Sequence, residues 1–139
     1  MNSFPTPEHA VGIERMSDGF LKLHPGPPVH VFTQAVDEEY HDHPFTFTTH
    51  IIAGSYTEEI LQWDGTRYTI ETFHRLMGTS HEVKADTIHR ITGLPEGFCV
   101  TRAEYGPTVR KPGFYTLRED GLYHRYHDTH VYQRVTYPI

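Results

Sequence analysis

The sequence predicts an all-β domain with the strand arrangement of a sandwich or barrel. The chain has 9 Tyr and 8 Phe among 139 residues, and aromatic residues are enriched in strands. From Val29 onward, short runs of β-branched and aromatic residues alternate with turn residues at close spacing, which is typical of sandwiches and barrels. The length suits a single domain with one hydrophobic core.

Residues 1–28 are predicted to form an N-terminal arm that packs on the barrel. Prolines at positions 5, 7, 25, 27 and 28 interrupt any long element in this segment, although a short strand could fit within residues 19–23. Residues 29–139 are predicted to form the barrel itself. Within them, only residues 33–40 could hold a helical turn.

The barrel segment divides into strand-like runs separated by Gly, Pro and Asp. They cover residues 29–32, 45–53, 56–62, 67–73, 89–91, 98–105, 113–117 and 122–126. Ala53 and Gly54 are predicted to form a tight two-residue loop that doubles the chain back and sets Thr49 opposite Glu58. Because cross-strand partners share a face, Glu58 would point to the same side as Thr49, whereas a one-residue change in the loop would bring Glu59 there instead.

Composition excludes several classes of function. A formal net charge of −6 and the lack of any Lys/Arg run argue against nucleic-acid binding. The single cysteine, Cys99, can form no intrachain disulfide. No run of 18 apolar residues and no apolar signal core is present, so we expect a cytoplasmic protein with no membrane span.

The chain has 12 histidines, and two of them, His41 and His43, form a His-x-His pair. Residues at i and i+2 of a strand point to the same face, so both imidazoles could reach one ion at about 2.1 Å. Phe45 and Phe47 share that face and are expected to line the adjoining pocket. Asp42 lies on the opposite face, so the His-x-Asp pattern of many iron oxygenases is not met.

These residues resemble the first motif of the cupin superfamily, which has a His-x-His pair, a Glu four residues later and a Gly seven residues after that. His41, His43 and Gly54 fall on this spacing, but Phe47 occupies the Glu position. A third histidine comes from the second motif, where His89 is the best match.

The rival for that third position is His81, which stands among charged residues and is expected at the surface. A narrower resemblance is to small uncharacterised bacterial and phage cupins, through His-Asp-His-Pro-Phe, Gly-x-Tyr-x-Glu-Glu and His-Arg-Ile between His41 and Phe114. In that group Glu58 is the natural replacement for the missing first-motif Glu.

The resemblance implies a single cupin barrel, a jelly roll or double-stranded β-helix, that holds one divalent transition metal: Fe, Mn, Ni, Co or Zn. The ligands it implies are His41, His43, Glu58 and His89. It points first to an iron-type dioxygenase acting on a small molecule. The pocket would be shaped by Phe45, Phe47 and Tyr56, and Arg102 would orient an anionic group; Arg90 and Arg102 could equally pair with surface carboxylates.

Three alternatives stay open at the level of the sequence. The chain could be a non-catalytic module that binds a small ligand, or a metal-dependent isomerase or lyase. It could also be a metal-free epimerase, which would need a His base beside a Tyr acid. The resemblance also implies a homodimer, for which the unpaired edge strands of an open barrel would provide the interface.

Overall fold

The computed structural model describes residues 13–15, 20–23, 29–34 and 39–135. These ranges contain strands and no helix, and the strand pairs are antiparallel, so the all-β prediction is confirmed. The strands are β1 (Ile13–Arg15), β2 (Phe20–Leu23), β3 (Val29–Phe32), β4 (Tyr40–His41), β5 (Phe47–Trp63), β6 (Tyr68–Leu76), β7 (Ser80–Val83), β8 (His89–Gly93), β9 (Cys99–Tyr105), β10 (Gly113–Arg118), β11 (Gly121–Tyr126) and β12 (Gln133–Arg134).

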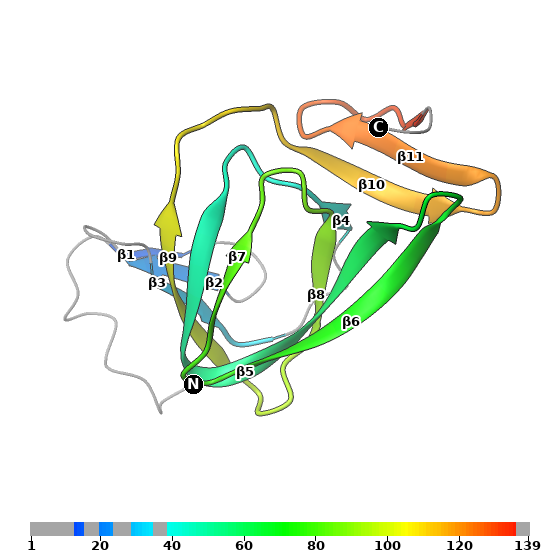
Figure 1. The fold of residues 1–139 in the computed structure, drawn as a ribbon. Helices are drawn as coiled ribbons and strands as arrows, with labels where there is room; N and C mark the ends of the chain where they lie inside the picture. Colours follow the sequence, from blue (N-terminus) through cyan, green and yellow to red (C-terminus); the bar gives the residue numbers. More distant parts are fainter. Residues whose placement is uncertain (1–12, 16–19, 24–28, 35–38, 136–139) are drawn as a thin grey trace.

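The strands form one path in the order β1-β2-β3-β9-β5-β8-β4-β10-β11-β12, with β6 and β7 paired to β5. β5 is the central element, because its first half pairs with β7 and β9 and its second half pairs with β6 and β8. Figure 1 shows how β5 curves from one side of the molecule to the other while β6 follows it as a hairpin partner. The candidate site lies where the strands that pair with the first half of β5 meet those that pair with its second half.

Most predicted strands coincide with observed ones, but the hairpin predicted at Ala53 and Gly54 is wrong. β5 runs unbroken from Phe47 to Trp63, and Thr49 lies opposite His81 and Ala103 rather than Glu58. The residues after Gly54 find their hairpin partner in β6, which returns only after the turn at residues 64–67. Strands β1, β4, β7 and β12 lie outside the strand-like runs predicted from the sequence.

A one-residue irregularity in β5 decides which residues face inward. The register against β9 shifts between Ile51 and Ala53, so Ile52 is the extra residue of a bulge and is about half exposed. Before it Thr49 and Ile51 are buried, and after it Tyr56 and Glu58 are buried. Because side chains alternate along a strand, one inserted residue moves the inward set from odd to even positions. Glu58 therefore points inward, although not through the predicted hairpin.

Gly54 follows directly after this bulge and has a φ of +71°. A Cβ atom there would collide with the main-chain carbonyl oxygen of Phe98 on the neighbouring chain segment. Both the left-handed backbone and the close approach require glycine at this position.

The N-terminal segment contributes β1 and β2, which extend the sheet beyond β3; the short strand expected within residues 19–23 is β2. Residues 1–12 of the predicted arm lie outside the described residues, as does most of the segment predicted to hold a helical turn.

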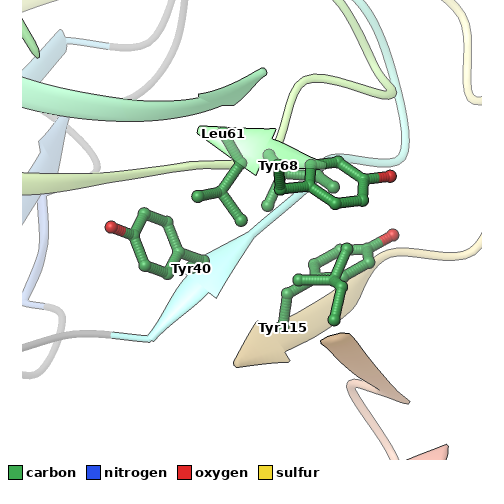
Figure 2. Close-up of a cluster of buried hydrophobic side chains, with 6 residues drawn as sticks. Tyr40, Leu61, Tyr68 and Tyr115 are labelled. Carbon is green, nitrogen blue, oxygen red and sulfur yellow. The ribbon is translucent and has the colours of Figure 1, made fainter. Parts of the chain in front are cut away.

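Two clusters of buried side chains stabilise the fold. One lies between β5, β6 and the β10–β11 hairpin, and four of its members are labelled in Figure 2: Tyr40, Leu61, Tyr68 and Tyr115. The other is smaller and lies near the bulge, where Phe32, Ile51, Tyr56 and Cys99 pack together. No described segment forms a helix of the length and hydropathy needed to cross a membrane.

Candidate metal centre

Three histidines come together: His41 of β4, His89 of β8 and His43 in the segment just after β4, so that His41 and His43 form the β4 side of the group. His41 lies directly opposite His89, and His43 follows His41 two residues later. The ring centroids are 5.0 Å apart for His41 and His43, 4.8 Å for His41 and His89, and 4.9 Å for His43 and His89. Each residue offers one ring nitrogen, and these atoms all lie within 4.8 Å of one another. Two atoms bound at about 2.1 Å to one ion lie at most about 4.2 Å apart, so small ring rotations would complete a site.

The hydrogen bonds of two rings define which nitrogen carries a lone pair. Nδ1 of His41 lies 3.1 Å from the main-chain oxygen of Glu39, and Nδ1 of His89 lies 2.7 Å from Oε1 of Glu58. Since these oxygens only accept, both Nδ1 atoms carry a proton, and in the neutral ring Nε2 is the nitrogen with the lone pair. Nε2 of His89 and Nδ1 of His43 are buried without a hydrogen-bond partner among the described residues. Buried unpaired nitrogens are costly, and a metal ion would satisfy them.

Burial disfavours the charged forms of His41 and His43. Desolvation and the neighbouring His89 lower the pKa of His41 to about 4 and that of His43 to about 2. A neutral imidazole can bind a cation without first losing a proton. The donor set therefore fits a transition metal at neutral pH.

Glu58 lies behind His89 and outside the group of converging nitrogens. Its side chain is 1% exposed; Oε1 accepts from Nδ1 of His89, and Oε2 accepts from Nε of Arg75 at 2.7 Å. Burial alone would raise the pKa of Glu58, but the bonds from His89 and Arg75 outweigh it and hold that pKa below its ordinary value. The structure thus places Glu58 as a carboxylate that orients His89, with both of its oxygens already engaged.

Asp42, between the two β4 histidines, anchors β4 to β10. Its buried carboxylate accepts from the main-chain N–H of Gly113 at 2.8 Å and from the hydroxyl of Tyr115 at 2.6 Å, and it pairs with Arg110 at 3.0 Å. Its own N–H donates to the carbonyl of Gly113 at 3.1 Å. Because Asp42 faces β10, its neighbours His41 and His43 face the opposite side.

The structure corrects the surface position expected for His81. Its side chain is only 10% exposed, and its Nε2 lies 2.9 Å from the hydroxyl of Tyr56 and 3.5 Å from Oε2 of Glu58. Side chains alternate along β7, and His81 stands two residues before the buried Val83, so this alternation predicts an inward-facing His81. Arg75 was also missed, since its approach to Glu58 depends on the β5–β6 register.

A cavity of about 220 Å³ adjoins the three histidines. Phe45, Phe47 and Tyr56 lie in its wall, as the sequence suggested. Its lining residues are His30, Phe32, His41, His43, Phe45, Phe47, Thr49, Tyr56, Val83, His89, Ile91, Thr101 and Tyr105. Arg102 does not line it, because the adjacent Thr101 of β9 has the inward parity and Arg102 points outward, 3.7 Å from Glu104.

Phe47, at the position where the cupin motif has Glu, packs edge-on against His43 with ring centroids 4.8 Å apart. Among the residues that the structure describes, no carboxylate belongs to the cavity lining. The candidate site is therefore three imidazoles beside an aromatic wall.

No protein-family model matches the sequence, and comparison with curated protein sequences gives no significant match. Among solved structures, hydroxypropylphosphonic acid epoxidase from S. wedmorenis is similar over 72% of this chain and 56% of its own, with 13% identity and a TM-score of 0.51. The chain has the cupin fold. At this identity the likeness concerns the fold alone, and the chain spans about half the length of the epoxidase.

Two further solved structures are similar at lower scores. The same epoxidase in complex with fosfomycin matches over 63% of this chain and 50% of its own, with 12% identity and a TM-score of 0.48. The capsular polysaccharide assembling protein CapF from Staphylococcus aureus matches over 67% of this chain and 29% of its own, with 14% identity and a TM-score of 0.47.

Proposed function

We propose that this cupin binds one divalent transition metal through His41, His43 and His89 and acts as a dioxygenase-like enzyme on a small molecule. The observation that carries the proposal is the convergence of three imidazoles, two of them with a lowered pKa, at the wall of an apolar cavity. Such a ligand set suits Fe(II), Mn(II), Co(II), Ni(II) or Zn(II). When bound, the ion would supply Lewis acidity and open positions for oxygen or a substrate oxygen atom.

The residues of this chain have distinct roles in the proposal. Glu58 fixes the proton of His89 on Nδ1 and thereby presents Nε2 to the site. Asp42 holds the strand that carries the other two histidines. The aromatic wall excludes water from the reacting side of the site.

The cavity lining favours oxygen chemistry over the acid–base alternatives. No described carboxylate faces the cavity as a general base for hydrolysis or isomerisation. Two Tyr–His contacts lie near the cavity: Tyr56 with His81, which is not part of the lining, and Tyr105 with His30, both of which line it. The convergence of three imidazoles nevertheless favours a metal-dependent reaction over a metal-free epimerase.

The first test is the metal content of tag-free protein, measured by elemental mass spectrometry beside a His41→Ala/His43→Ala variant. His50→Ala is the matched control, because His50 is also partly buried on a strand but bonds to Ser80 outside the cavity. We expect about one ion per chain in the parent and the control and none in the double variant. Absence of metal from the parent after reconstitution would overturn the proposal; bound metal without oxygen consumption would favour the non-catalytic alternative.

A further inference from the structure

The cavity has the size of a single-ring molecule. Its volume is about 220 Å³. An engineered apolar cavity of about 150 Å³ in another protein binds benzene, and general ligand pockets measure about 300–1,000 Å³. The present cavity therefore accommodates a six-membered ring with one or two substituents, and its volume lies below the usual range for larger ligands.

Aromatic side chains surround this space. Phe45 and Tyr105 lie 4.5 Å apart between ring centroids, and Phe47 lies 5.7 Å from Tyr105 and 6.1 Å from Phe45. On the other side Phe32 lies 6.1 Å from Tyr56. Such rings favour edge-on or offset packing with a further ring, which a bound aromatic molecule would provide.

The described lining contains no Lys or Arg that could neutralise a charged substituent. The nearby guanidinium groups are held by carboxylates instead: Arg75 by Glu58, Arg90 by Glu59, and Arg110 by Asp42. A carboxylate or phosphonate facing this wall would lose its hydration without gaining an ionic partner, which is strongly unfavourable. The wall thus selects against the anionic group that the sequence had suggested Arg102 would bind.

Two hydroxyls of the wall already have partners. The hydroxyl of Tyr56 lies 2.9 Å from Nε2 of His81, and that of Tyr105 lies 3.3 Å from Nε2 of His30. Thr49 and Thr101 add hydroxyl groups to the lining. These groups can meet a hydroxyl or carbonyl, and they do not compensate a full charge.

We propose that the cavity binds an uncharged single-ring aromatic molecule whose one oxygen substituent faces His41, His43 and His89. The orientation of that oxygen rests on the proposed metal centre. The preference for an uncharged ring rests only on the wall, so it applies to the metal-free protein as well.

The test measures the dissociation constants of phenol, 4-hydroxybenzoate and 2-naphthol by titration calorimetry on metal-free and zinc-loaded protein. These probes share the hydroxyl and differ by one carboxylate or one fused ring. In the metal-free form we expect phenol to bind at least about tenfold more tightly than either of the others, because the described wall offers the carboxylate no Lys or Arg. Zinc should increase the affinity for phenol further. Only this increase depends on the proposed metal centre.

Two variants locate the binding site. Tyr105 and Tyr126 have similar exposure, 39% and 45%, but only Tyr105 lines the cavity. Tyr105→Ala should weaken phenol binding about fivefold or more by removing one aromatic wall, whereas Tyr126→Ala should leave it within about twofold. Equal effects of the two substitutions would contradict the assignment to this cavity.

The proposal is overturned if 4-hydroxybenzoate binds the folded, metal-free parent as tightly as phenol. Tight 2-naphthol binding would overturn the single-ring limit. Failure of phenol to bind either form would overturn the proposal whatever the metal content.

Discussion

The candidate centre is supported differently on its two sides. On the β8 side, His89 bonds to a buried carboxylate that in turn pairs with Arg75. On the β4 side, within the described part of the chain, His41 bonds to a main-chain oxygen and Nδ1 of His43 has no hydrogen-bond partner. The β4 side is instead held through its backbone, by Asp42 and by the bond from His43 N–H to the carbonyl of Ala85 at 3.1 Å.

The comparison shows that a site can be positioned either by orienting a side chain or by fixing the strand that carries it. The buried carboxylate of Glu58 orients a single side chain, that of His89. The backbone contacts of Asp42 and His43 instead fix the segment that carries His41 and His43, and they do not touch the ring atoms of either histidine. Substitutions on the two sides should therefore differ in what they change.

The largest effect is expected from Glu58→Gln. The substitution removes the charge that Arg75 and His89 share, and it leaves Arg75, 20% exposed, without its ionic partner. We expect a loss of about 3 kcal/mol in the free energy of unfolding and a 10- to 100-fold loss of zinc affinity. Urea unfolding and zinc titration against a chelating dye would measure the two effects.

Glu59→Gln is the matched control for this change. Glu59 is the next residue of the same strand and pairs with Arg90 at 2.9 Å, but its side chain is 23% exposed and it has no contact with His89. Its substitution should cost about 1 kcal/mol or less and leave zinc affinity unchanged. Equal losses in the two variants would mean that Glu58 acts through general stability and does not orient His89.

Asp42→Asn tests the backbone support and should have the next largest effect. The amide can keep one acceptor for Gly113 but loses the ionic contact with Arg110 and part of the bond from Tyr115. We expect about 2 kcal/mol of destabilisation, since hydrogen bonds to charged groups contribute about 1.5–3 kcal/mol. Asp86→Asn, at an exposed position before β8, is the control and should change little.

Asp42→Asn also separates the two kinds of support. Because Asp42 acts on the strand, we expect both His41 and His43 signals to broaden or shift in a 15N–1H imidazole spectrum while His89 is little affected. A change confined to His89 would contradict the distinction between the two sides.

Much of this site could be anticipated from the sequence, because the period of a strand and the spacing of motifs are local properties. The parity of His41 and His43 predicts that they point to one side, and the structure has them together with His89. The inward position of Glu58 was also anticipated, but through a loop that does not exist. A single bulge residue, Ile52, produces the same parity, and no local signal distinguishes a bulge from a tight turn at an Ala-Gly pair.

The partners of Glu58 and Asp42 could not be predicted, because they depend on long-range register. Arg75 reaches Glu58 only through the pairing of β5 with β6, and Tyr115 reaches Asp42 through the pairing of β4 with β10. The position of Arg102 was missed for a related reason. In β9 the inward positions are Thr101 and Ala103, and only the register against β5 shows this.

Acid should destabilise the metal-free protein mainly through the β4 side. The folded pKa values of His41 and His43 are lowered to about 4 and about 2, below the value of about 6.5 expected in the unfolded chain. The unfolded state therefore binds more protons between those values. Stability is complete above pH 6.5 and is lost as the pH falls toward 4.

Melting temperatures measured between pH 7.5 and pH 5 would check this dependence. In His41→Ala/His43→Ala the decline toward acid should become shallower. Part of it should persist, because the pKa of His81 is also lowered to about 4, chiefly by burial. An unchanged slope in the double variant would assign the acid sensitivity to other groups.

The smallest effect is expected from Thr46→Val, which tests the last contact on the β4 side. The Thr46 hydroxyl accepts from the N–H of Ala85 at 3.0 Å, and the carbonyl of Ala85 accepts from the N–H of His43. Valine keeps the shape but leaves that N–H unpaired, so we expect about 1 kcal/mol of destabilisation and at most about a threefold loss of zinc affinity. Thr48→Val, two residues along, is the control and should stay within about 0.5 kcal/mol. A loss of zinc affinity as large as that of Glu58→Gln would mean that the backbone support, and not the ionic one, controls the centre.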